Sequence, residues 1–128
     1  MSRTLEFYKS KKCGNVVEVV VNGGGSLSCC GEDMKLLKAN SSDGAGEKHV
    51  PAVEVNGNVV TVKVGSVEHP MTEEHHIAFV VLVTEKTVQR VDLPHTGKPE
   101  AVFTLAADDK AVAAYEYCNL HGLWVAEI

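Results

Sequence analysis

The segment "EYCNLHGLW" near the C-terminus places a thiol, Cys118, three residues before an imidazole, His121. A thiolate and an imidazole at this spacing can bind one metal ion, but two ligands make only half of a site. The chain contains six histidines, so the missing ligands can be sought among the other five. Because a single histidine is more often a surface or hydrogen-bonded residue than a ligand, the surroundings of each one must decide.

Three of these histidines lie in segments that could bring their side chains close together in space. His49 follows a small, glycine-containing stretch in "GEKHVP", and His69 and His75 lie close together in "EHPMTEEHH". The proline after His69 restricts its backbone to extended or turn conformations, and loops at one end of a β-sandwich cluster in space. With the pair near the C-terminus they form a candidate set of five ligands. We expect the other two, His76 and His95, to be ordinary polar residues.

The spacing of these five candidate ligands is compatible with three different metals. Tetrahedral structural zinc needs four ligands and would leave one candidate unused. A blue-copper site uses two histidines, one cysteine and usually an axial methionine, but no methionine follows Cys118. Iron bound by imidazoles and a thiolate is the third possibility, and it would be redox-active.

Short β-branched runs, separated by turn residues, must position these loops. Several runs alternate apolar and polar residues with a period of two, which is typical of half-buried strands, and nothing indicates a long helix. The sequence therefore predicts an all-β fold. The six runs between residues 50 and 118 predict an immunoglobulin-like β-sandwich, with a hairpin at "NGN" (56–58). The predicted strands are 16–21, 50–55, 59–64, 77–84, 87–93, 101–105 and 111–118.

The polar, small-residue segment "KANSSDGAGEKH" (38–49) interrupts this rhythm and predicts a domain boundary. We expect a small N-terminal domain over residues 1–37 and the β-sandwich over residues 38–128. The first segment is too short to build its own core without a metal or a partner surface.

Composition narrows the function classes for these 128 residues. The N-terminus lacks the apolar run of a signal peptide, and no stretch is long enough to span a bilayer, so we expect a cytoplasmic protein with no membrane partner. Four cysteines in a reducing compartment favour metal ligation over disulfides. The net charge of −5 and the absence of a basic block argue against a nucleic-acid partner.

The motifs "EKHVP", "KVGSVEHPM", "EEH" and "EYCNLHGLW", in this order, resemble the superoxide reductase family, the desulfoferrodoxins and neelaredoxins. The resemblance covers essentially the whole chain. It implies a one-electron reduction of superoxide to hydrogen peroxide, for detoxification, at one mononuclear non-haem iron per chain. The resemblance implies four equatorial imidazoles and one axial thiolate, from His49, His69, His75, His121 and Cys118.

The same resemblance implies catalytic roles for Glu47 and Lys48, beside the coordination position that the five ligands leave open. Lys48 would attract the anionic substrate, and Glu47 would occupy the open position once iron is ferric. The implied partners are superoxide, a rubredoxin-like electron donor and a second copy of the chain in a homodimer. Two alternatives use the same ligands: a non-catalytic iron electron-transfer or metal-binding protein, and a structural zinc protein.

The segments "YKSKKCGN" and "SCCGEDM" resemble a desulforedoxin-like module, whose pattern is Cys-x-x-Cys followed by a Cys-Cys pair. Cys13, Cys29 and Cys30 match this pattern, but Ser10 stands in place of the fourth thiolate. Three explanations are open: a natural loss of the second centre, an engineered Cys→Ser substitution, or a metal held with serine or water as fourth ligand. We expect a second iron to be absent or poorly bound.

Overall fold

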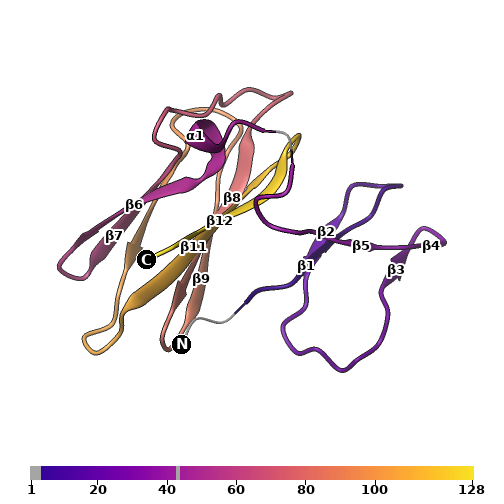
Figure 1. The fold of residues 1–128 in the computed structure, drawn as a ribbon, viewed down its shortest axis with the longest axis horizontal. Coiled ribbons are helices and arrows are strands. Elements are labelled where there is room, and N and C mark those ends of the chain that lie inside the picture. Colours follow the sequence, from indigo (N-terminus) through magenta and orange to yellow (C-terminus); the bar gives the residue numbers. More distant parts are fainter. Residues whose placement is uncertain (1–3, 43) are drawn as a thin grey trace. The chain divides into compact units, whose positions relative to one another are not determined.

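The computed structural model describes residues 4–42 and 44–128. Apart from the four-residue helix α1 (Gly46–His49), its regular elements are β-strands, which confirms the all-β prediction (Figure 1). The described residues form two compact units, one ending at Lys38 and the other beginning at Ala39. None of the helices in the described part of the chain has the length and apolar character needed to cross a membrane.

The C-terminal unit is the predicted β-sandwich. One sheet has three strands in the order β10-β7-β6, the other has four in the order β12-β11-β8-β9, and all neighbours are antiparallel. The seven strands are β6 (Pro51–Asn56), β7 (Val59–Val64), β8 (Ile77–Thr84), β9 (Val88–Asp92), β10 (Glu100–Thr104), β11 (Ala111–Cys118) and β12 (Gly122–Glu127).

The predicted runs between residues 50 and 118 all contain strands, but β12 was missed. This strand begins at Gly122, whose positive φ of 79° lets the chain turn back along β11. The hairpin at residues 56–58 is confirmed, since Asn56 pairs with Val59 across a two-residue loop. Gly57, with φ of 62°, is the first central residue of that loop, as a type II′ turn requires.

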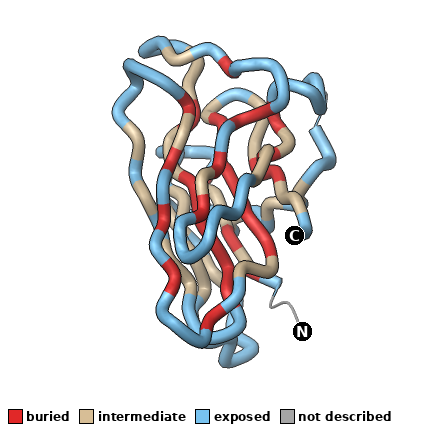
Figure 2. Tube along the Cα trace, turned by 90° about the vertical axis from the view of Figure 1, so that its left-hand side faces the viewer, coloured by how far each residue is buried: buried red, intermediate tan, exposed pale blue. Residues whose placement is uncertain are grey.

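The core lies between the two sheets and fixes the strand ends that carry the loops. Val60, Val62 and Val64 alternate inward along β7 and belong to one buried cluster with residues of β8, β10 and β11. In Figure 2 the buried positions lie mostly along the strands, and the turns at their ends are largely exposed. Each of these fully buried valines contributes about 1.5–3 kcal/mol of hydrophobic stabilisation. Cys118 belongs to the same cluster, so the sulfur of the candidate metal site is anchored in the buried core of the unit.

Glu116 is an acidic residue in this largely apolar interior. Its side chain on β11 is fully buried, and both carboxyl oxygens lack a hydrogen-bond partner among the described residues. Burial raises the pKa of Glu116 to about 9, because removal from water disfavours the charged form. The carboxyl group is therefore protonated in the folded protein at neutral pH.

Glu116→Met should stabilise the protein, and more strongly as the pH rises. Between pH 4.5 and 9 the unfolded chain ionises this carboxyl while the folded chain holds its proton, so raising the pH favours unfolding of the wild type only. The difference should grow by about 1.4 kcal/mol per pH unit, or roughly 3 kcal/mol from pH 6 to pH 8. Denaturant unfolding at both pH values measures it.

The matched control for this prediction is Glu85→Met, which removes an exposed carboxylate from the same unit. Its effect on unfolding free energy should hardly change between the two pH values. An equally pH-independent effect of Glu116→Met would contradict the protonated, buried carboxyl.

The N-terminal unit consists of very short strands. They form a three-stranded sheet in the order β2-β1-β5 and a two-stranded ribbon, β3-β4. The predicted strand 16–21 ends early, because Val20 and Val21 are 81% and 84% exposed and no described residue pairs with them to extend the sheet. The strands are β1 (Phe7–Lys9), β2 (Val16–Glu18), β3 (Ser28–Cys29), β4 (Glu32–Asp33) and β5 (Lys35–Leu36).

Candidate metal centre

Five side chains from four separate segments converge at one end of the sandwich. One comes from α1, two from the loop between β7 and β8, one from the last residue of β11 and one from the turn before β12. Each offers one ligand atom, and these atoms all lie within 4.8 Å of one another. The converging residues are His49, His69, His75, Cys118 and His121.

The four imidazoles form a square. Neighbouring ring centroids are 4.5–5.1 Å apart in the cyclic order His49, His69, His75, His121. The ring centroids of His49 and His75 are 6.4 Å apart, farther than those of neighbouring rings, and the two ring planes are inclined by only 29°, as expected for opposite corners. Neighbouring rings are steeply inclined, at 70–85°, so each ring turns an edge toward the centre.

Hydrogen bonds fix which nitrogen of two rings is available. Nδ1 of His49 lies 2.8 Å from the carbonyl oxygen of Ala45, and Nδ1 of His69 lies 2.7 Å from that of Pro70. Because a carbonyl only accepts, both neutral rings carry their proton on Nδ1 and a lone pair on Nε2. The two Nε2 atoms are 3.1 Å apart, and two lone pairs at this distance need a cation between them.

The other two rings complete the inward set. Nε2 of His75 is buried without a hydrogen-bond partner in the described structure, and Nδ1 of His121 lies 3.1 Å from Nε2 of His49. Adjacent nitrogens at right angles around one ion, each about 2.1 Å from it, would be separated by about 3 Å. The spacing observed here therefore fits a single metal ion.

Cys118 lies on one side of this square. Its Sγ is 3.4 Å from Nε2 of His69 and 3.9 Å from Nδ1 of His121, which occupy opposite corners. A sulfur near two opposite corners lies over the middle, so the thiol takes the axial place. Burial raises the pKa of Cys118, and backbone N–H groups of His121 and Leu120 oppose this shift by hydrogen bonding to the sulfur. Binding a cation would therefore displace a thiol proton.

Burial also favours the neutral form of three of the four imidazoles. Burial lowers the pKa of His69 to about 4 and also lowers the pKa of His49 and of His75. In His49 and His69 the hydrogen bond between Nδ1 and a backbone carbonyl acts in the opposite direction and raises the pKa. Neutral imidazole is the form that binds metal. Four imidazole nitrogens and one sulfur suit a redox-active transition metal such as iron and exceed what tetrahedral zinc requires.

Asn119 ties the loop of His75 to the loop of the sulfur ligand. Its Nδ2 donates to the carbonyl oxygen of Glu74 at 2.9 Å, and its Oδ1 accepts from the backbone N–H of His76 at 2.9 Å. Its own backbone N–H donates to the carbonyl of His76 at 3.2 Å. Asn119 therefore forms hydrogen bonds to both neighbours of His75 in sequence.

Two positioning residues were missed in the sequence. The indole of Trp124 stacks on His49, with centroids 4.9 Å apart, and donates from Nε1 to the carbonyl oxygen of His121 at 3.1 Å. A Cβ added to Gly44 would lie 2.9 Å from the ring of His49. The tryptophan stands in the motif around Cys118 and could have been suspected, whereas no sequence pattern marks Gly44.

Glu47 and Lys48 occupy the exposed positions of α1 directly before the buried His49. The positive charge of Lys48 contributes to lowering the pKa of both His49 and His75, so it acts on two corners of the square. His76 and His95 are not part of the cluster. Nδ1 of His76 instead lies 2.9 Å from the carbonyl oxygen of Thr72.

The comparison with known proteins agrees with this geometry. A family model for desulfoferrodoxin matches residues 41–127, and one for the desulfoferrodoxin N-terminal domain matches residues 2–37. The chain belongs to the desulfoferrodoxin family. The resemblance seen in the motifs is thereby confirmed.

Similarity within the desulfoferrodoxin family extends over the whole chain. A desulfoferrodoxin from Nitratidesulfovibrio vulgaris is 51% identical over 127 residues, which is 99% of each chain. A superoxide reductase from Pyrococcus horikoshii is 37% identical and covers 69% of this chain and 91% of its own. The crystal structure of the superoxide reductase from Treponema pallidum superposes with a TM-score of 0.83 at 45% identity, covering 98% of this chain and 100% of its own.

A second cluster of possible metal ligands lies in the N-terminal unit. Cys13, Cys29 and Cys30 also have their sulfurs within 4.8 Å of one another, a spacing that could hold a metal ion. Ser10 is 2% exposed, and its Oγ accepts hydrogen bonds from the backbone N–H groups of Lys12 and Cys13 at 3.2 and 3.3 Å. A hydrogen bond from the Ser10 side chain is the largest cause that lowers the pKa of Cys13 to about 7.

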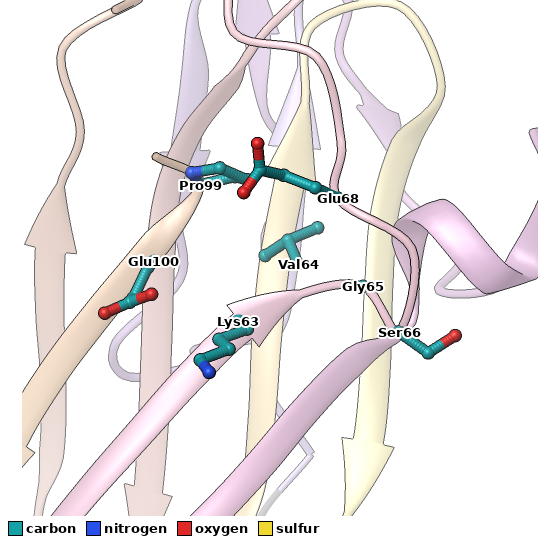
Figure 3. Close-up of a pocket in the computed structure, with 7 residues that line it drawn as sticks. All are labelled: Lys63, Val64, Gly65, Ser66, Glu68, Pro99 and Glu100. Carbon is teal, nitrogen blue, oxygen red and sulfur yellow. The ribbon is translucent and has the colours of Figure 1, made fainter. Parts of the chain in front are cut away.

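A surface pocket lies beside the loop that leads to His69 (Figure 3). The carboxylates of Glu68 and Glu100 and the ammonium group of Lys63 line it, together with Gly65 and Ser66. None of the five converging side chains contributes to it. Its two carboxylates disfavour the binding of an anion in this pocket.

Gly65 permits the close approach of that loop to α1. A Cβ at this position would lie 2.6 Å from the carbonyl oxygen of Glu47, which accepts hydrogen bonds from Val67 N–H at 2.9 Å and Ser66 Oγ at 3.2 Å. Gly65→Ala should therefore separate α1 from the loop, lower the unfolding free energy by about 1–3 kcal/mol and weaken metal retention. Thermal unfolding and metal analysis measure both effects.

The control is Gly46→Ala in α1 itself, where the added Cβ would meet only Val50, at 4.0 Å. This variant should unfold within about 0.5 kcal/mol of the wild type. A Gly65→Ala protein as stable and as metal-retentive as the Gly46→Ala protein would show that the tight contact is not required.

Proposed function

We propose that this chain is a superoxide reductase that holds one iron ion by His49, His69, His75, His121 and Cys118. The observation that carries the proposal is the square of four imidazoles with a thiol over its middle. Within the described residues, no sixth histidine, cysteine or carboxylate joins the cluster, so the face opposite the thiol has no protein ligand. A small anion can approach on that face.

Bound iron supplies the one electron that, with two protons, converts superoxide into hydrogen peroxide. With iron bound, Cys118 would hold it through a thiolate and would supply electron density to it, as a cysteine ligand does in some haem enzymes. Backbone N–H groups of Leu120 and His121 hydrogen bond to this sulfur and moderate its donation. The neutral imidazoles leave the centre positively charged, which favours an anionic substrate.

Lys48 supplies a local positive charge at this face and attracts superoxide. The protein as a whole carries a net charge of −5, which opposes an anion. At physiological ionic strength, however, charges beyond about 8–10 Å are largely screened, so the nearest charge dominates. The exposure of Lys48 and its influence on two imidazoles support this role.

Glu47 is the proposed carboxylate that takes the open position after turnover. It is exposed and one residue from Lys48, and a hard, anionic oxygen donor suits ferric iron. Glu47→Ala should leave the reaction of the reduced protein with superoxide within about threefold of wild type, because the carboxylate acts only afterwards. The visible spectrum of the oxidised protein should shift instead; an unchanged spectrum would remove Glu47 from this role.

The wider setting follows from the same proposal. We assign residues 1–37 to a desulforedoxin-like domain and residues 38–128 to the catalytic domain. The protein acts as a cytoplasmic homodimer in superoxide detoxification and receives electrons from a rubredoxin-like donor. Its iron content is one per chain, because the N-terminal cluster lacks a fourth thiolate.

Metal analysis combined with the visible spectrum of the oxidised protein tests the metal assignment. Five ligands with an axial thiolate predict about one iron per chain and a sulfur-to-iron charge-transfer band. Zinc gives no such band. A colourless, zinc-loaded protein purified from cells supplied with iron would contradict the proposal.

A further inference from the structure

The N-terminal unit contains three thiols whose sulfurs nearly touch. Sγ of Cys13 is 3.5 Å from Sγ of Cys29, which is 3.9 Å from Sγ of Cys30. Cys13 and Cys30 are exposed and Cys29 is half-buried, so dissolved small molecules reach the cluster. This cluster takes no part in the iron site described above.

Ser10 occupies the place of a fourth thiol but does not replace it chemically. Its buried Oγ accepts two backbone hydrogen bonds, from Lys12 and Cys13. A serine hydroxyl is a weakly acidic oxygen donor and a poor partner for the soft metals that three thiolates select. The cluster thus keeps the close sulfurs of a metal site and lacks the complete set of thiolates that would protect them.

We propose that Cys13 and Cys29 form a dithiol that hydrogen peroxide oxidises to a disulfide. Peroxide oxygen is transferred to Cys13, which becomes a sulfenic acid while the other oxygen leaves as water. Cys29 then attacks the sulfenic sulfur, a second water leaves, and the S–S bond forms. Overall, two thiols and one hydrogen peroxide give one disulfide and two waters, with two electrons passing from sulfur to oxygen.

The geometry selects this pair among the three. The sulfurs of Cys13 and Cys29 need to close from 3.5 Å to about 2.05 Å, a movement within reach of side-chain rotation. Cys30 is farther from Cys29, and its backbone has a positive φ of 53°. Asn15 Nδ2 lies 3.8 Å from Sγ of Cys29 and holds that sulfur beside the pair.

The oxidant has a natural source in the same chain. Hydrogen peroxide is the product of the proposed iron chemistry, and only this origin of the peroxide rests on the proposed function. The reaction of the thiols themselves does not, since added peroxide replaces the product. The pair would therefore record turnover of the enzyme as a covalent change in its N-terminal unit.

Thiol mapping of the full, iron-loaded chain tests the proposal. The protein is reduced, freed of reductant, treated anaerobically with a few equivalents of hydrogen peroxide, and alkylated in denaturant. Cleavage after glutamates separates residues 7–18, with Cys13, from residues 19–32, with Cys29 and Cys30. We expect these two peptides to be joined by a reducible bond, with two of the four thiols lost to alkylation.

Single substitutions identify the partners. Cys30→Ser should still form the linked peptides, whereas Cys13→Ser and Cys29→Ser should not. A bond between Cys29 and Cys30, irreversible oxidation with no linked peptides, or three thiols unchanged by peroxide would each overturn the proposal. So would two metal ions per purified chain. Superoxide consumption, measured on the same preparations, reports separately on the iron site.

Discussion

Cys118→Ser should abolish both the charge-transfer band of the oxidised protein and the rapid reaction with superoxide. Cys118 is fully buried and is the only sulfur among the five converging ligands. Serine has nearly the same shape, so the substitution removes the thiolate without opening a large cavity. Since loss of a residue that only orients a ligand commonly costs 10–100-fold, loss of the axial ligand should cost at least about 100-fold in rate.

Stopped-flow measurement of superoxide decay with the reduced protein gives this rate, and iron analysis corrects it for metal content. Cys30→Ser is the matched control, because it makes the same chemical change at an exposed thiol of the N-terminal unit. It should leave band and rate unchanged. A Cys118→Ser protein that keeps the band and reacts within tenfold of wild type would contradict the axial assignment.

Lys48→Ala should slow the reaction with superoxide and flatten its dependence on ionic strength. One charge about 8 Å from the substrate contributes roughly 0.5–2 kcal/mol, depending on the local dielectric constant. This corresponds to a rate lower by about 2- to 30-fold at low salt, with the difference from wild type shrinking as salt is added. Lys48→Arg should restore most of the rate, because it keeps the charge.

The control is Lys110→Ala, which changes the net charge by the same amount. Lys110 is exposed and precedes β11, whose other end carries Cys118, so roughly 25 Å of extended strand separates it from the sulfur. This distance exceeds the screening length, and the rate should hardly change. Equal effects of the two substitutions would show that net charge, not local attraction, governs the approach of superoxide.

The sandwich could be predicted because its strands follow local rules. β7 alternates buried and less buried residues, and the hairpin before it needs a glycine at its first turn position. Both features are local in sequence. β12 was not predicted, because this segment forms a strand through its pairing with β11 after the turn that carries His121. Strands that depend on such pairing carry a weaker sequence pattern.

In the candidate metal site, too, some features could be predicted from the sequence and others could not. The types and order of the five candidate ligands singled out these residues, and the fold brings them together. Contacts between distant segments could not be predicted from the sequence. They are the stacking of the Trp124 ring on His49, the hydrogen bonds of Asn119 to both neighbours of His75, and the close approach of Gly65 to the carbonyl of Glu47. Each depends on distances between segments that are far apart in sequence.

Glu116 was not anticipated either, because an acidic residue in a strand is normally expected to face water. Its burial follows from its position on β11, two residues before the buried Cys118 and therefore on the same face of the strand. The alternation of residues along a strand shows which face of the sheet a side chain lies on. Whether that face is buried depends on the packing of the second sheet against it.

The stoichiometry of an anaerobic superoxide pulse tests the central claim most directly. The reduced, iron-loaded chain is mixed with less than one equivalent of superoxide, and hydrogen peroxide, dioxygen and oxidised iron are measured together. We predict one hydrogen peroxide and one oxidised iron for each superoxide consumed, with no dioxygen released. Iron that stays reduced, or dioxygen released in step with superoxide consumption, would contradict the assignment as a superoxide reductase.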